Sequence, residues 1–278
     1  MWDYLQAVVL GLLQGLTEFL PISSSAHLRI YPQLFGWGDP GAAFTAVVQI
    51  GTELAVLLYF RKDIWRIAVT WVRSLAKPEF RGHRDARMGW FIILGSLPIV
   101  VLGLLFEDAI DSALRSLWVV GTTLIVFGVV LGLADKYGRN DKPIEKLTLR
   151  HAVLMGLAQA AALVPGVSRS GATISMGRAL GYERAAATRY AFLLAIPAVV
   201  GAGVYKLKDI GEEANAYGWG ETAVATLVSF VVGYAAIAWL LRYVSTRSYA
   251  PFVAYRVLLG GAVLLLLALG VLTPLAGA

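Results

Sequence analysis

An apolar segment near the N-terminus contains a carboxylate, three hydroxyls and an imidazole among ten consecutive residues. They lie in the stretch QGLTEFLPISSSAH at 14–27. Gln14 and Glu18 are four residues apart and so share one helix face, and Pro21 breaks the helix. Such a group supplies a base, nucleophile candidates and a metal ligand. The less specific interpretation is a serine-capped helix start with a hydrogen-bonded histidine. The candidates are Gln14, Glu18, Ser23, Ser24, Ser25 and His27.

A second polar stretch, PGVSRSGAT at 165–173, has the composition of an anion-binding turn. Glycines such as Gly166 and Gly171 let the backbone approach a ligand, and N–H groups at a following helix start attract anions. Arg169, flanked by Ser168 and Ser170, adds a rigid charged fork that suits phosphate. The stretch has no Gly-Lys-Ser/Thr ending, so it is not a Walker motif. The alternative is an ordinary glycine-rich turn whose arginine reaches to the membrane interface.

A weaker polar pair, Gln49 and Glu53, is spaced i, i+4 within the apolar stretch 42–60. The pair could line the same cavity or add a second carboxylate to it. The alternative is a polar contact between helices.

The elements that must position these groups are membrane helices. Of the 278 residues, 58% are hydrophobic and 15% are charged, against about 45–50% and about 25% in soluble domains. There is no cysteine, which excludes disulfides and thiolate metal sites. The composition predicts an all-α polytopic membrane protein, with no nucleic-acid partner. Six stretches are long enough to cross: roughly 42–60, 88–106, 117–134, 185–205, 223–241 and 257–273.

Two further apolar stretches, 4–22 and 152–167, are short, rich in glycine, and run into the two polar motifs. Broken helices are tolerated at membrane depth only when they are buried in protein or line a wet cavity. We therefore expect two re-entrant helical hairpins, which bring the polar motifs together near the middle of the membrane.

The charges of the loops predict the sidedness, because Lys and Arg gather in cytoplasmic loops. Segments 61–87, 135–151 and 242–256 carry eight, five and three basic residues, whereas 107–116 and 206–222 are acidic. The sides alternate as six crossings require. The net charge of +6 is thus a topology signal.

Six crossings require the first hairpin to enter the membrane from the outside and the second to enter from the inside. An internal repeat in the sequence supports this opposite orientation. At an offset of 145, residues 7–25 match 152–170 at seven of nineteen positions, including the glycine, glutamine and paired serines. This predicts an inverted repeat in a single membrane domain, 1–278, with halves of about 1–140 and 145–278.

The two motifs resemble the signatures of the undecaprenyl-diphosphatase family of the bacitracin-resistance type. QGLTEFLPISSSAH is similar to the family's (Glu/Gln)-x-x-x-Glu motif with its following Pro-x-Ser-Ser stretch and His, and PGVSRSG to its second motif. FTAVVQIGTELAVLLYFRKDI at 44–64 also resembles the family's next helix. The resemblance covers essentially the whole chain. Position 14 is Gln where many members have Glu.

The resemblance implies a multi-pass enzyme of the bacterial inner membrane that removes the terminal phosphate of undecaprenyl diphosphate, a polyprenyl diphosphate lipid. It implies a site open to the outer face, dependence on a divalent cation (Mg²⁺ or Ca²⁺), recycling of the lipid carrier for cell-wall synthesis, and bacitracin resistance. The implied functional residues are Glu18, His27 and Arg169, with Ser23 and Ser24 beside them.

From these residues we expect Arg169 and the backbone of 166–171 to hold the phosphates and Glu18 to hold the cation, while His27 acts as base or acid. Ser24 is the expected nucleophile, with His27 or an activated water as alternatives. Substrate contacts are expected from Gln14, Ser23, Ser25, Gln49, Gly166, Ser168, Ser170 and Gly171.

Other functions fit the same architecture. A transporter or flippase of an anion or lipid phosphate would use Arg169 for binding alone, without chemistry. Small residues such as Gly121, Gly128 and Gly132 could pack helices within one chain or in a homodimer.

Overall fold

The computed structural model describes residues 2–37, 39–111, 113–209 and 217–274. In these ranges the regular secondary structure is helical, apart from one isolated bridge between Lys142 and Tyr182. The α-helices are α1 (Trp2–Thr17), α2 (Ser24–Leu34), α3 (Gly41–Tyr59), α4 (Arg61–Ala76), α5 (Arg84–Leu105), α6 (Glu107–Asp111), α7 (Leu117–Tyr137), α8 (Leu149–Ala160), α9 (Arg169–Ala179), α10 (Arg184–Lys206), α11 (Trp219–Val244) and α12 (Ala250–Ala268). Short 3₁₀ turns lie at Pro78–Phe80, Ala113–Arg115, Ile144–Lys146, Ala161–Leu163 and Leu207–Asp209.

Six helices are long and apolar enough to cross a membrane, which confirms the expected number of spans. They are α3, α5, α7, α10 with its following 3₁₀ turn, α11 and α12, and they run for 19 to 26 residues. At a rise of about 1.5 Å per residue, these lengths correspond to roughly 28 to 39 Å, enough to cross a hydrocarbon layer of about 30 Å. Many large apolar side chains on them face outward, as they must if lipid is the solvent.

The two polar motifs each join a pair of shorter helices. The pair α1 and α2 has 16 and 11 residues, and the pair α8 and α9 has 12 and 11. Each second helix is capped by a serine with left-handed backbone: Ser23 has φ 74° and Ser168 has φ 71°. The capping geometry is thus the same at two positions 145 residues apart. Re-entry of the hairpins from opposite sides stays a prediction.

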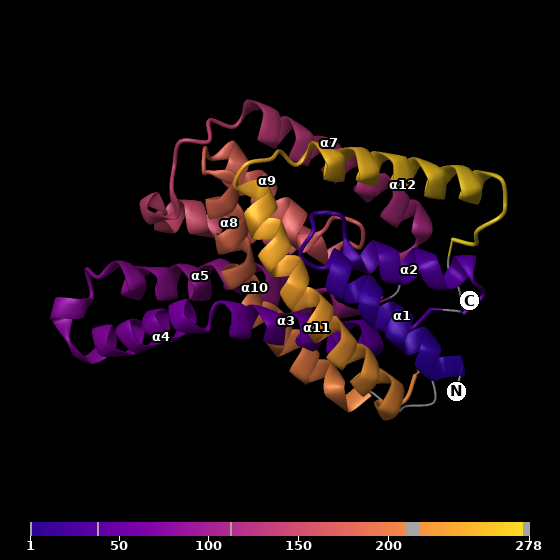
Figure 1. Ribbon diagram of the computed structural model, residues 1–278, viewed down its shortest axis with the longest axis horizontal. Coiled ribbons are helices and arrows are strands. Elements are labelled where there is room, and N and C mark those ends of the chain that lie inside the picture. The colour runs from indigo at the N-terminus through magenta and orange to yellow at the C-terminus, as the bar shows by residue number, and fades with distance from the viewer. Residues whose placement is uncertain (1, 38, 112, 210–216, 275–278) are drawn as a thin grey trace.

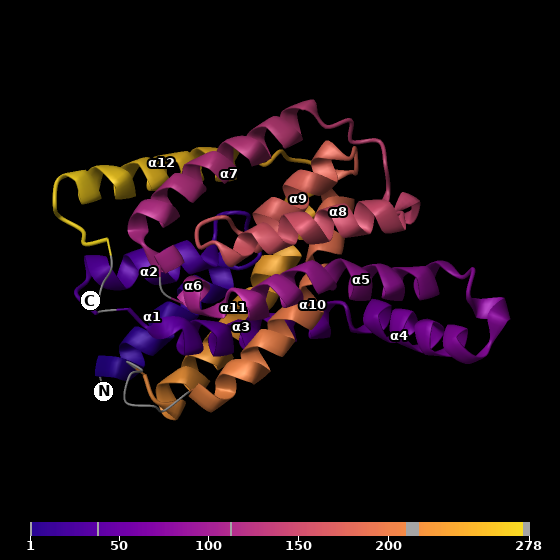
Figure 2. The ribbon, with the colours of Figure 1, turned by 180° about the vertical axis from the view of Figure 1, so that it is seen from behind.

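Glycines pack the hairpins against helices of the other half of the chain. A Cβ at Gly11 of α1 would lie 2.5 Å from the Ala225 carbonyl oxygen of α11, and one at Gly156 of α8 would lie 2.0 Å from the Gly95 carbonyl oxygen of α5. Figure 1 shows α1 lying along α11, and Figure 2 shows α8 beside α5. Because only glycine permits these approaches, the two halves interlock around a shared core.

Two segments differ from the loops expected between spans. Most of 61–87 is α4, an amphipathic helix that folds back along α5 (Figure 1). The segment 242–256 ends earlier than expected, because α12 begins at Ala250 with Pro251 in its first turn. Arg256 therefore lies inside α12 and is fully buried. Counting it as a loop charge was wrong. The exposed bases that remain in that segment are Arg242, in the last turn of α11, and Arg247, which follows α11.

Candidate active site

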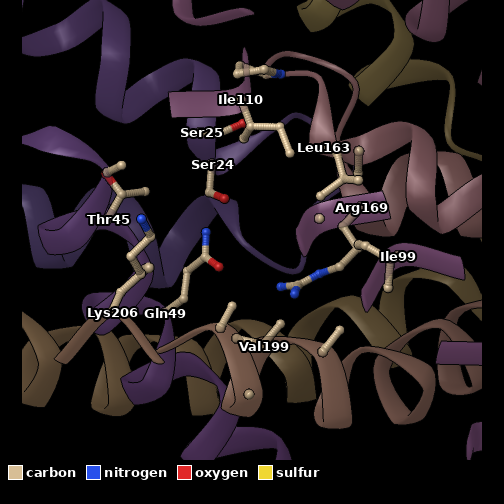
Figure 3. Close-up of a pocket in the computed structure, with 18 of the residues that line it drawn as sticks. Ser24, Ser25, Thr45, Gln49, Ile99, Ile110, Leu163, Arg169, Val199 and Lys206 are labelled. Atoms are coloured by element: carbon tan, nitrogen blue, oxygen red, sulfur yellow. The ribbon is translucent and has the colours of Figure 1, made fainter. Parts of the chain in front are cut away.

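Each polar motif contains a non-helical turn: the first turn is 18–23, between α1 and α2, and the second turn is 164–168, before α9. A cavity of about 480 Å³ lies among α3, α5, α9 and α10, beside both of these polar turns. Glu18, Ser24 and Arg169 lie on its polar side, while its walls on α5 and α10 are mainly apolar. In Figure 3, Ser24, Gln49 and Arg169 point into one space from three different helices. The apolar walls include Ile99, Val100, Leu104, Val199 and Ala202.

The first turn holds Glu18 and Ser24 in contact. Glu18 follows α1 directly, and its backbone N–H still donates to the Gln14 carbonyl, at 3.0 Å. Ser23 caps α2 and makes Ser24 the first helical residue. The Ser24 hydroxyl donates to Glu18 Oε2 at 2.5 Å, and Gln14 Nε2 donates to the same oxygen at 2.8 Å. A serine hydroxyl that donates to a buried carboxylate has a proton acceptor already in place.

The second turn also ends in a serine that caps the following helix, and it is hydrogen-bonded to the first turn. The Gly171 N–H donates to the capping Ser168 hydroxyl at 3.1 Å, and the Ser170 hydroxyl donates to the Leu20 carbonyl at 3.2 Å. Gly166 has φ +91°, and a Cβ there would lie 2.1 Å from the Thr123 hydroxyl oxygen. Glycine is therefore required at 166 both for its backbone conformation and for the close approach of α7.

Arg169 joins the two turns electrostatically. Its guanidinium donates to Glu18 Oε1 and lies 3.6 Å from Glu53 Oε1. The structure thus brings three of the four expected catalytic residues together: Glu18, Ser24 and Arg169.

His27 is not brought to the cavity. Its Nδ1 lies 2.7 Å from the Ser23 carbonyl oxygen, which can only accept, so Nδ1 carries the proton. Its Nε2 lies 2.7 Å from the Tyr255 hydroxyl, and the two rings stack with centroids 5.6 Å apart. Both ring nitrogens are thus engaged away from Ser24. In this structure His27 links the first turn to Tyr255, and Glu18 is the group that accepts the hydrogen bond of the Ser24 hydroxyl.

The expected substrate-binding residues divide into two groups. Ser23, Ser25, Gln49 and Ser168 line the cavity. The others do not line the cavity and instead make contacts within and between the two turns: Gln14, Gly166, Ser170 and Gly171.

Arg256 is a residue that the sequence reasoning missed. Its guanidinium donates to the Pro21 carbonyl of the first turn at 3.1 Å, and to the Gly166 and Val167 carbonyls of the second turn at 2.9 Å each. A further bond reaches the Leu124 carbonyl of α7 at 3.2 Å. Pro251 was the available signal, because proline favours the first turn of a helix and would have started α12 before Arg256.

Ion pairs lie near the ends of α5 and α10, at the rim of the cavity. Lys206 donates to Glu107 at 2.7 Å, and this hydrogen bond lowers the pKa of the Glu107 carboxyl. Arg115 binds Asp39 through both carboxylate oxygens. Burial raises the pKa of Asp39, but the bonds from Arg115 outweigh burial and leave that pKa below its ordinary value. The rim is therefore charged and internally paired at neutral pH.

The residues around Arg169 fit a hard divalent cation if amide and phosphate oxygens complete its shell. Two carboxylates, Glu18 and Glu53, share one guanidinium, and the buried oxygens Glu53 Oε2 and Gln14 Oε1 have no hydrogen-bond partner among the described residues. Oxygen ligands of this kind suit Mg²⁺ or Ca²⁺. The described residues contain no cluster of three acidic, histidine or cysteine side chains that would suffice alone.

The fold and the site define a polytopic helical membrane protein with a cavity lined by an arginine and by a serine–carboxylate pair. The model of the family described as "Bacitracin resistance protein BacA" matches residues 7–262, and the chain belongs to this family. It is 74% identical to an undecaprenyl-diphosphatase of Nocardioides sp., over 98% of this chain and 99% of the relative. It is 60% identical to an undecaprenyl-diphosphatase of Micrococcus luteus over 97% and 99%, and 58% identical to that of Thermobifida fusca over 99% and 94%.

Proposed function

We propose that this protein is an undecaprenyl-diphosphate phosphatase of the bacterial inner membrane. It releases inorganic phosphate from the lipid diphosphate, returns the lipid phosphate carrier to cell-wall synthesis and thereby confers bacitracin resistance. The observation that carries the proposal is the contact of Ser24 and Arg169 with the same carboxylate, Glu18, beside an apolar-walled cavity. Relatives that bear this activity in their names match nearly the whole chain.

The division of the cavity into polar and apolar parts suits the diphosphate head of such a substrate and the adjoining part of its chain. The diphosphate would lie beside Ser24 and Arg169, and the polyprenyl chain would leave along the apolar walls of α5 and α10. Gly103 and Gly201 contribute no side chain to these walls. Because the tail must stay in lipid while the head reaches the polar turns, a cavity with this division of polarity suits a lipid diphosphate.

The residues support the following chemistry. Substrate phosphate oxygens replace Glu18 as the hydrogen-bond acceptors of the Arg169 guanidinium. The guanidinium then stabilises the negative charge that develops during phosphoryl transfer. Ser24 Oγ attacks the terminal phosphorus, its proton passes to Glu18, and the bond to the bridging oxygen breaks to release the lipid phosphate. The departing lipid phosphate takes the proton from Glu18, which is then ionised again. Water attacks the phosphorus of the phosphoserine and gives a proton to Glu18, and Glu18 passes this proton to Ser24 Oγ as inorganic phosphate leaves. In the alternative route, Glu18 activates a water that attacks the phosphorus directly.

A divalent cation bound near Glu18 would supply charge neutralisation for the diphosphate oxygens. Glu18, Glu53 and the carbonyl oxygen of Gln14 are the groups that would hold it. The site draws all of these groups from one chain, so the proposal needs no second copy.

The cavity would open to the outer side of the membrane. Its rim includes Glu107, Arg115 and Lys206, which belong to the acidic segments 107–116 and 206–222. Acidic segments alternate with strongly basic ones along the chain, and the basic ones favour the cytoplasm.

The decisive experiment measures phosphate release from undecaprenyl diphosphate by the purified protein in detergent, with and without a chelator. We expect release that falls when the chelator is added. A transporter needs no serine donating to a carboxylate and would release no phosphate in detergent, where there is no gradient. Absence of release under both conditions would overturn the proposed function.

A further inference from the structure

Glu53 of α3 is a buried carboxylate that packing does not explain. Only 1% of its surface is exposed. Oε2 has no hydrogen-bond partner among the described residues, and Oε1 lies 3.6 Å from Arg169, beyond hydrogen-bond distance. A structural acid inside a membrane protein is normally paired or hydrogen-bonded, because an uncompensated buried charge is costly. A polar contact between helices, one of the interpretations of this residue from sequence, would have satisfied both oxygens.

The charge around Arg169 is unbalanced. Glu18 and Glu53 together carry −2 when ionised, and Arg169 supplies +1, so the cluster has a net charge of −1. Arg169 is bonded to Glu18, which leaves Glu53 without a full partner. When a phosphate engages Arg169, both carboxylates lose their counter-charge together. A group of this kind lacks positive charge, and a divalent cation would provide it.

Gln14 completes the same cluster without contributing charge. Its Nε2 donates to Glu18 at 2.8 Å and lies 3.5 Å from the Thr52 hydroxyl oxygen, next to Glu53 in the chain. Its own Oε1 is buried and unpartnered. The unpartnered oxygens of Gln14 and Glu53 thus belong to one polar cluster, which also contains Glu18 and Arg169.

We propose that Glu53 is the second carboxylate of the reaction centre: it positions Arg169 and, with Glu18, binds the divalent cation, supplying the charge that Gln14 lacks. This role rests on the proposed function. It predicts that a carboxylate at position 14 can replace the one at position 53, because both positions serve the same cluster.

The test compares four forms of the full-length protein in detergent: wild type, Glu53→Gln, the exchange variant Gln14→Glu/Glu53→Gln, and Glu79→Gln. The last removes a carboxylate from the exposed turn Pro78–Phe80 and serves as the charge control. Three quantities are measured: Mg²⁺ affinity by calorimetry without substrate, the melting temperature in chelator, and phosphate release from the lipid diphosphate.

We expect Glu53→Gln to weaken Mg²⁺ binding roughly 10- to 100-fold, with a similar loss of phosphate release. Its melting temperature in chelator should equal or exceed that of wild type, since the substitution removes a buried carboxyl group that has no full partner. The exchange variant should regain at least part of both the affinity and the activity, and Glu79→Gln should match wild type in all three.

Two results would overturn the proposal. If Glu53→Gln fails to fold or melts well below wild type, Glu53 is a structural residue. If it binds Mg²⁺ within threefold of wild type, Glu53 is not a cation ligand. A wild type that binds Mg²⁺ but releases no phosphate would instead count against the proposed function, so the two failures are distinguishable.

Discussion

At the scale of single residues, the site depends on one carboxylate that accepts from two directions. Glu18 Oε2 receives the Ser24 hydroxyl, and Glu18 Oε1 receives Arg169. The serine is therefore oriented by the group that would take its proton. In the proposed reaction, a substrate phosphate would replace the carboxylate as the partner of Arg169.

Arg169 should be irreplaceable by lysine. Arg169→Lys keeps the charge but loses the planar fork that can hold two phosphate oxygens and a carboxylate at once. We expect kcat to fall by about 10²- to 10³-fold, as for the loss of one transition-state donor. Steady-state phosphate release measures this. Arg150→Lys, the same change at an exposed position at the start of α8, is the control, and a variant as active as that control contradicts the phosphate clamp.

Ser24 distinguishes the covalent route from direct attack by water. If Ser24 is the nucleophile, Ser24→Ala should lose roughly 10³-fold or more in turnover. The wild type quenched with acid during turnover should carry phosphate on Ser24, detected by mass spectrometry of peptides. Ser245→Ala, at the exposed end of α11, is the control. Near-normal turnover in Ser24→Ala would leave Glu18-activated water as the attacking group.

At the scale of elements, the side chain of Arg256 holds the two polar turns together. Its guanidinium has no acidic hydrogen-bond partner among the described residues. Arg256 donates to backbone carbonyls from both turns and from α7. Broken helices leave carbonyls unpaired at membrane depth, and these must find donors inside the protein. A guanidinium supplies several donors from one side chain, which explains an arginine here.

Replacement of Arg256 should loosen both turns together. Arg256→Lys cannot reach all of these carbonyls, and each carbonyl left without a donor costs about 1–3 kcal/mol. We expect a lower melting temperature in detergent and a loss of kcat larger than the change in KM, because Ser24 and Arg169 are no longer held in register. Arg247→Lys, on the exposed turn after α11, should change neither quantity. A stable Arg256→Lys with full kcat would contradict this positioning role.

At the scale of the whole molecule, the halves of the chain are interlocked. α1 packs on α11 and α8 packs on α5, so each hairpin is supported by a helix of the other half. The contacts that hold Glu18 and Arg169 in place therefore depend on packing between the two halves.

The predicted orientation can be tested directly because the chain contains no cysteine. Ala109→Cys, on exposed α6 near the cavity rim, should react with a membrane-impermeant maleimide added to intact cells. Glu79→Cys, at the other end of α5, should react only after the membrane is opened. Phosphate release by both variants controls for folding. The reverse labelling pattern would place the cavity on the cytoplasmic side.

The amino-acid sequence by itself determined the parts of this protein that depend on local chemistry. Apolar length specified the six spans, and the proline-serine and glycine-serine stretches specified two capped turns. The pairing of Gln14 with Glu18 also followed from spacing, since residues four apart share a helix face. These features involve neighbours along the chain, and a sequence displays them directly.

Only the tertiary structure decided which of these groups meet. Arg169 contacts Glu18, 151 positions away in the sequence, and Arg256 contacts Pro21, 235 positions away. His27 is hydrogen-bonded to Tyr255, outside the lining of the cavity. Glu53 of α3 likewise comes within 3.6 Å of Arg169, which lies on α9. Such contacts depend on the packing of distant helices through glycines and on the demand of buried carbonyls and charges for partners. Spacing along the chain does not encode them.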